Sequence, residues 1–223
     1  AEIVKERGVI FHTDAVQAAG KIDIDLEEIP ADLLSISAHK FYGPKSVGAL
    51  FIRNSFSQQI SLTPLIHGGG QERGKRSGTE NIPGIVGLGS ASDIASNEMR
   101  QDESRIIELR DQLFQSITQD IEGVKLNGIL ERQLWNTLNL SIEGVEGESL
   151  SMNLDIEGVA VSTGSACSEG TVDPSHVLSA MGLSKGEAAS SVRISLGRFT
   201  EKEEIDYIAS IFPMIVERIR GVK

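Results

Sequence analysis

The sequence predicts an α/β fold. Short apolar stretches at 9–12, 33–37 and 47–52 have the length and composition of strands. Helix-like or loop segments separate them, and this alternation favours a sheet that is at least partly parallel. Farther along, residues 91–121 carry a long helical pattern.

The same pattern predicts two domains. Glycine-rich sequence gives way to the long helix near residue 95, so we expect one domain at 1–95 and a second at 96–223. A chain of 223 residues with 39% hydrophobic residues has enough apolar material for a real core.

The N-terminal elements follow in order. Residues 1–8 read as the last turns of a helix that Gly8 ends. This helix has no initiator Met and no cap before it, so we expect the sequence to begin inside a larger domain. Val9–His12 then forms the first strand, Leu33–Ser37 the second and Val47–Ile52 the third.

In the long helix, apolar residues spaced by three and four predict a single buried face. They are Ile106, Leu109, Leu113 and Ile117.

The C-terminal elements mix strands with helices. We expect strands at Leu138–Ile142 and Ser191–Leu196, with a helix at Gly147–Asp155 between them. Thr200 and Glu203 form a capping-box pattern that opens the last helix. Pro213 should kink or interrupt that helix, because proline lacks the backbone donor.

Composition excludes some functions. The formal net charge is −11, from 32 acidic and 21 basic residues, which argues against general nucleic-acid binding. No apolar run approaches the roughly 20 residues of a membrane span, and no signal peptide is visible. The single cysteine, Cys167, rules out an intrachain disulfide and fits a reducing, cytoplasmic compartment.

An acidic side chain follows the first strand. Asp14 lies within His-Thr-Asp-Ala-Val-Gln at 12–17, and in open α/β sheets ligands bind at the carboxyl ends of strands. A carboxylate there could pair with a cationic ring nitrogen. Alternatively, Asp14 caps a short helix that starts at Ala15.

The second strand ends on Ser37-Ala38-His39-Lys40. An amine beside a buried strand end is costly to desolvate unless it has a task, and Lys40 could form a Schiff base there. Alternatively, its long stem lets the charge reach water. The Ser-x-x-Lys pattern also matches a serine-acylation motif, but its Ser-Asp-Asn and Lys-Thr-Gly partners do not occur in the chain.

Residues 67–79 are rich in glycine and in basic side chains. The segment Gly69–Lys75 matches the first part of a phosphate loop, but Arg76 stands where a Ser or Thr should hold magnesium. With Thr79 at its end, the segment can still bind a phosphate. The alternative is a mobile surface loop.

Two further residues suggest chemistry. Cys167 lies in a loop at 162–173 whose Ser and Gly residues cannot bury it, which suits a thiol that moves and reacts. An accidental surface cysteine is the alternative. Arg193 alternates with apolar neighbours on a strand and could bind a carboxylate or form a structural ion pair.

Together these segments resemble the cysteine desulfurases, the NifS/IscS-like family of pyridoxal-phosphate enzymes. The matching stretches occur in the family's order: HTDAVQAAGK, SAHKFYGPKSVGAL, HGGGQERGKRSGTEN, STGSACSEG and SSVRISLGRFT. The resemblance implies the aspartate-aminotransferase fold (fold type I). The chain would supply the C-terminal part of the large domain and the small C-terminal α+β domain of a homodimer. The family's substantial N-terminal portion before Asp14 is not in this sequence.

The resemblance also implies roles around pyridoxal 5'-phosphate. Asp14 would pair with the ring nitrogen and Gln17 would contact the phenolic oxygen. Ser37 and His39 would hold the phosphate, and Lys40 would form the Schiff base. No metal is implied.

Three roles lie outside that cluster. Thr79 would donate a phosphate contact across the dimer, and Arg193 would hold the substrate carboxylate. Cys167 would take the sulfur of L-cysteine as a persulfide, releasing alanine, for an iron–sulfur scaffold or another acceptor protein. Alternatives are a selenocysteine lyase, a related aminotransferase, or a non-catalytic sulfur-carrier or scaffold-binding module.

Overall fold

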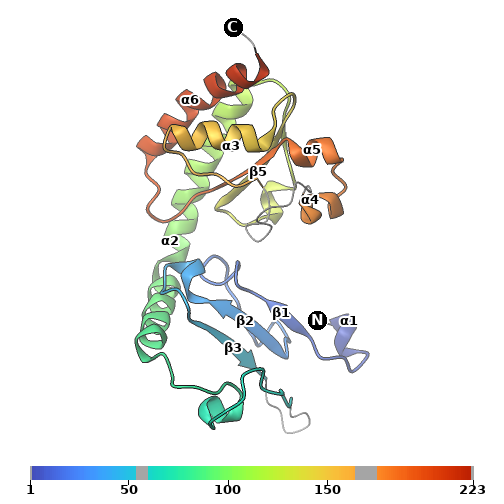
Figure 1. Ribbon diagram of the computed structural model, residues 1–223, viewed down its shortest axis with the longest axis vertical. Helices are drawn as coiled ribbons and strands as arrows, with labels where there is room; N and C mark the ends of the chain where they lie inside the picture. Colours follow the sequence, from blue (N-terminus) through green and yellow to red (C-terminus); the bar gives the residue numbers. More distant parts are fainter. Residues whose placement is uncertain (1, 54–59, 164–174, 222–223) are drawn as a thin grey trace. The chain divides into compact units, whose positions relative to one another are not determined.

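The computed structural model describes residues 2–53, 60–163 and 175–221. It divides into two compact units, Ala1–Arg100 and Gln101–Lys223, so the division falls inside the long helix α2, Ile82–Asp120 (Figure 1). The sequence-based domain limit near residue 95 stays a prediction. None of the helices in the described ranges is long and apolar enough to cross a membrane.

A three-stranded sheet, in the order β1-β2-β3, forms the centre of the N-terminal unit. Strand β2 pairs in parallel with β1 and antiparallel with β3. The expected parallel pairing is therefore present, within a mixed sheet. Besides the first part of α2, the unit contains α1 (Glu2–Lys5), β1 (His12–Asp14), β2 (Leu33–Ser37), η1 (Ala38–Phe41), β3 (Gly48–Ile52) and η2 (Gln71–Gly74).

The C-terminal unit has its own antiparallel sheet, in the order β4-β5-β6. Helix α3 contacts both α6 and β6. Besides the end of α2, the unit contains β4 (Val124–Leu126), η3 (Leu130–Arg132), β5 (Thr137–Ile142), α3 (Gly147–Ile156), α4 (His176–Ala180), α5 (Lys185–Ala189), β6 (Ser191–Ser195) and α6 (Lys202–Arg220).

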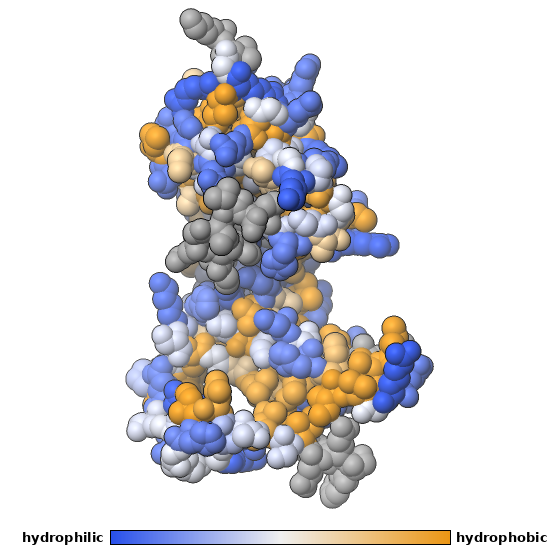
Figure 2. Space-filling view, turned by 45° about the vertical axis from the view of Figure 1, so that its right-hand side comes forward, coloured by the Kyte–Doolittle hydropathy of each residue, from blue (hydrophilic) through white to orange (hydrophobic). Residues whose placement is uncertain are grey.

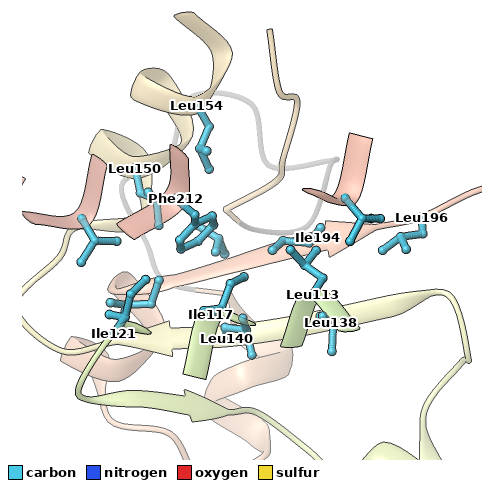
Figure 3. Close-up of a cluster of buried hydrophobic side chains, with 14 of the residues drawn as sticks. Leu113, Ile117, Ile121, Leu138, Leu140, Leu150, Leu154, Ile194, Leu196 and Phe212 are labelled. Carbon is cyan, nitrogen blue, oxygen red and sulfur yellow. The ribbon is translucent and has the colours of Figure 1, made fainter. Parts of the chain in front are cut away.

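The larger of the two buried apolar clusters lies in the C-terminal unit, and Figure 3 shows part of it. The face predicted for the long helix is confirmed, because its four apolar residues are at most 8% exposed. They pack with residues of the sheet and of helices α3 and α6, among them Leu138, Leu140, Leu150, Leu154, Ile194 and Phe212.

The N-terminal unit has a much smaller apolar cluster. Ala19, Phe41 and Ala91 are its buried members. Larger apolar side chains lie on the surface of this unit, where Figure 2 shows hydrophobic patches. Leu65 is 94% exposed and Val86 is 62% exposed.

Two expectations about the N-terminal elements were wrong at their limits. The first strand begins at His12 rather than Val9, because the ladder with β2 starts at the pair His12 and Leu33. The long helix begins at Ile82, not Ala91. The glycine-rich sequence had been placed before the helix, yet a Cβ on Gly87 would lie 2.4 Å from Cγ of Pro44, so this glycine allows close packing.

The last helix also differs from expectation at two points. Its capping box consists of Glu201 and Glu204, not Thr200 and Glu203. The Thr200 hydroxyl is occupied elsewhere, accepting a 3.0 Å hydrogen bond from the amide of Gly197. The helix continues through Pro213 to Arg220. Gly221, whose φ of 72° is left-handed, caps its C-terminal end.

Candidate functional site

The parallel pairing of β1 and β2 brings two of the predicted motifs to one sheet edge. Asp14, the last residue of β1, is aligned with Ser35 of β2. Strand β2 runs on to Ser37 and leads directly into η1, which contains His39 and Lys40. Five predicted residues therefore come from two segments that meet at the carboxyl end of this pair of strands: Asp14, Gln17, Ser37, His39 and Lys40.

The Asp14 carboxylate is exposed and makes a local turn. Its Oδ1 accepts a 2.9 Å hydrogen bond from the amide of Val16. The capping alternative is thus partly realised, although residues 16–21 form turns rather than a regular helix. No hydrogen bond to Oδ2 occurs within the described part of the chain, which leaves that oxygen available to a ligand.

Ser37 and His39 form a hydrogen-bonded pair. The distance from Oγ of Ser37 to Nδ1 of His39 is 2.9 Å. The serine is half-buried and the histidine is exposed, so both polar atoms lie near the surface where a phosphate could reach them. Ser37 ends strand β2 and precedes the short 3-10 helix η1 rather than an α-helix, and the partner tripeptides of the Ser-x-x-Lys motif are absent from the sequence.

Lys40 is half-buried within η1. The turn of η1 ends at Tyr42, a non-glycine residue with a left-handed φ of 67°. The backbone next to Lys40 is tightly packed, because a Cβ on Gly20 would lie 2.5 Å from Cβ of Phe41. The segment that carries the candidate amine therefore rests against the segment that follows Asp14.

Sequence reasoning missed Lys21, which joins these two segments. Its Nζ donates to the carbonyl oxygens of Gln17 and Lys40, each at 3.1 Å. Burial, together with the positive charge of Lys40, lowers the pKa of Lys21 below its usual value of 10.5. Lys21 ends the quoted stretch HTDAVQAAGK, but nothing in that stretch indicates a partner nineteen residues away.

The glycine-rich segment at 67–79 is held by its own hydrogen bonds. The Ser77 hydroxyl donates to the carbonyl of Gly69 at 2.7 Å, and Gln71 Oε1 accepts from the amide of Gly78 at 3.1 Å. Thr79 is exposed. Its expected contact with the phosphate of a second subunit stays a prediction.

Arg193 lies in the C-terminal unit, in the middle of β6. Its backbone pairs with Ser162, through bonds of 2.6 and 3.0 Å. Its Nε is buried and has no hydrogen-bond partner among the described residues. No ion pair to Arg193 occurs in that part of the chain, so the structural alternative has no support there. Cys167 falls outside the described residues.

The described part of the C-terminal unit contains surface clefts. One, of about 790 Å³, lies between β4, the end of β5 and α5. Another, of about 420 Å³, lies between β6 and α6. None of the predicted site residues lines either cleft, so neither is assigned to the predicted chemistry.

Known proteins resemble the chain over nearly its whole length. A cysteine desulfurase IscS of Clostridium botulinum is 49% identical over 221 residues, covering 98% of this chain and 55% of the relative. A cysteine desulfurase IscS of Dictyoglomus turgidum is 48% identical and covers 100% and 55%. The chain thus spans about half the length of these relatives.

Solved structures agree with this result. A NifS-like protein superposes with a TM-score of 0.82 at 38% identity, over 99% of this chain and 55% of the other. A NifS-like protein from Rickettsia africae gives 0.82 at 32% identity, over 99% and 56%. The predicted fold class and the resemblance to IscS/NifS proteins are confirmed. Because the family model of the class-V aminotransferases also matches residues 1–208, the chain belongs to the class-V aminotransferase family.

Proposed function

We propose that this protein is a cysteine desulfurase, which takes sulfur from L-cysteine and releases L-alanine. The observation that supports it most is the meeting of Asp14 and Lys40 at one edge of the β1–β2 pair. The identity of 48–49% to proteins named cysteine desulfurase supports the same reaction.

The residues at this edge fit pyridoxal 5'-phosphate. Asp14 has a carboxylate oxygen without a partner among the described residues, suited to a protonated ring nitrogen. Lys40 would hold the aldehyde carbon, Gln17 the phenolic oxygen, and the Ser37–His39 pair the phosphate. When bound, this cofactor supplies an electron sink that makes the α-proton of an amino acid acidic.

Arg193 would bind the substrate carboxylate. A guanidinium presents its donors in a planar fork that matches a carboxylate. The buried Nε lacks a partner among the described residues, and a buried donor in that state costs about 1–3 kcal/mol. A bound carboxylate would relieve that cost, which favours a ligand over a purely structural role.

Cys167 would accept the sulfur. Its thiolate attacks the substrate sulfur, the bond from that sulfur to Cβ breaks, and a proton completes alanine. A persulfide then remains on Cys167. The only cysteine of the chain stands at the position that the resemblance assigns to this step.

The proposal extends to partners and location. We infer a homodimer in which Thr79 reaches the phosphate of the second subunit. The persulfide would pass to an iron–sulfur scaffold or another acceptor protein. A single cysteine cannot form an intrachain disulfide, which supports a reducing compartment such as the cytoplasm.

The test uses this chain and a version completed at its N-terminus with the corresponding segment of a relative. Each is incubated with pyridoxal 5'-phosphate and L-cysteine. We expect a yellow protein, alanine release, and one added sulfur on Cys167 by mass spectrometry in at least one of the two forms. Cys167→Ser should still become yellow but gain no sulfur. A colourless protein that releases no alanine in both forms would refute the proposal.

The same assay separates the alternatives. A selenocysteine lyase would release alanine from selenocysteine but not from cysteine. An aminotransferase would need no thiol, so Cys167→Ser would keep its activity. A sulfur-carrier or scaffold-binding module would take up no cofactor.

A further inference from the structure

We propose that Lys21 is a positioning residue for Lys40. Its ammonium joins the turn that carries Gln17 to the segment η1 and thereby fixes the backbone from which the Lys40 side chain extends. The inference rests on the proposed function, in which the Lys40 amine holds the cofactor.

The geometry of Lys21 carries the inference. One nitrogen donates to two main-chain oxygens, of Gln17 and of Lys40, and both distances are 3.1 Å. The first partner lies four residues earlier in the same turn, and the second lies on the other segment of the site. The lysine therefore ties the main chains of two residues predicted to contact one cofactor.

Packing beside Lys21 limits how the two segments can separate. Gly20 has a left-handed φ of 73°, and the Cβ that it lacks would overlap Phe41, the residue after Lys40. Ala19 and Phe41 belong to the same buried cluster. The side chain of Lys21 thus leaves a turn that is already packed against η1, so less conformational freedom is lost when its two bonds form.

An ammonium suits this position. It offers three donors and no acceptor, so it can bind two carbonyl oxygens at once. An apolar side chain would leave the Lys40 carbonyl without this partner, at a site that is partly buried. Burial and the nearby positive charge of Lys40 lower the pKa of Lys21.

The consequence for the reaction follows from alignment. Displacing a reacting group by about 1 Å can reduce a rate by about 100-fold. Without Lys21, η1 keeps its packing on Gly20 but loses the bond to the carbonyl of Lys40 itself. The Lys40 amine would then reach the cofactor aldehyde less often.

The experiment compares Lys21→Met, which keeps the stem and loses the donors, with Lys21→Arg, which keeps donors and charge. Lys5→Met is the control, because Lys5 is an exposed lysine of α1 in the same unit. Each variant is made in the N-terminally completed protein. The apoprotein is mixed with pyridoxal 5'-phosphate, and samples are reduced with borohydride at intervals. Peptide mapping then gives the rate at which label appears on Lys40.

We expect labelling of Lys40 to slow at least about tenfold in Lys21→Met, to recover in part in Lys21→Arg, and to stay unchanged in Lys5→Met. In steady state, kcat should fall in Lys21→Met while KM for cysteine changes little. Labelling of Lys40 in Lys21→Met at the wild-type rate would overturn the inference.

Hydrogen exchange separates failure of the inference from failure of the proposed function. Amides of residues 38–43 in the apoprotein should exchange faster in Lys21→Met, while those of the C-terminal unit keep their rates. If Lys40 of the wild-type protein takes no label, the proposed function fails. Separately, amides of residues 38–43 that exchange at the wild-type rate in Lys21→Met would overturn the bridging role of Lys21. If Lys21→Met opens the whole N-terminal unit, Lys21→Arg decides. Recovery of both the exchange at 38–43 and the labelling of Lys40 supports the bridge, whereas recovered exchange with labelling as slow as in Lys21→Met overturns it.

Discussion

Replacing Gly20 with alanine should destabilise the N-terminal unit by two separable effects. The first is the backbone, because φ is 73° and a left-handed conformation costs an alanine about 1–2 kcal/mol. The second is steric. The new Cβ would lie 2.5 Å from Cβ of Phe41, against roughly 3.5–4.0 Å for an unstrained carbon contact. Overpacking of this kind costs about 1–3 kcal/mol.

Gly8→Ala is the matched control for the backbone effect. Gly8 has a φ of 63°, and a Cβ there would meet nothing within 4 Å. Both substitutions also restrict the unfolded chain to the same extent, so this contribution cancels between them. Gly20→Ala should therefore be the more destabilising of the two by about 1–3 kcal/mol, the cost of the contact with Phe41 alone.

Native-state hydrogen exchange of strands β2 and β3 measures this difference, because it reports the free energy at which the unit opens. Exchange through opening of the whole unit should be roughly 5- to 150-fold faster in Gly20→Ala than in Gly8→Ala. Equal rates in the two variants would show that η1 moves away from the turn without cost. The tight packing argued for the site would then be wrong.

Three further outcomes are expected. Hydrogen bonding to Lys125 lowers the pKa of Glu187 to about 2. The ionised carboxylate therefore stabilises the fold fully above the usual value of 4.5, and this stabilisation is lost as the pH falls toward 2. When the free energy of unfolding is measured from pH 6 to pH 2, Glu187→Gln should lack this pH-dependent part. Leu113→Ala empties a fully buried position and should reduce the free energy of unfolding by about 2–5 kcal/mol in urea, whereas Met152→Ala, at a side chain that is 65% exposed, should change it little. Arg193→Lys should raise KM for L-cysteine with a smaller effect on kcat, since an ammonium cannot reproduce the fork, and unchanged kinetics would point to a structural role.

Much of the fold could be predicted because its periodicity is local. The apolar spacing around Leu113 identified the buried face of α2, and the strand around Leu138 was found within one residue of its limits. The start of α2 was missed because a glycine such as Gly87 has two uses. It can mark a loop, or it can admit a neighbour, here Pro44, and only the fold distinguishes them.

The candidate site divides in a similar way. Asp14 and Lys40 could be singled out because each lies close to the end of a predicted strand, and parallel pairing then aligns the strand ends. Lys21 could not, because its second partner is a main-chain oxygen. Every residue has such an oxygen, so residue type carries no signal for this bond.

On the proposed function, binding of the cofactor would also stabilise the N-terminal unit, whose buried apolar cluster is small. A ligand that binds only the folded unit stabilises it by about 2.7 kcal/mol when present at 100 times its Kd. Against a typical free energy of unfolding of about 5–15 kcal/mol, such a gain is substantial. Cofactor binding would then make the folded unit harder to open. On the proposed function, bound pyridoxal 5'-phosphate would therefore raise the free energy at which β1 and β2 open, and protease digestion of these strands should be slower in its presence.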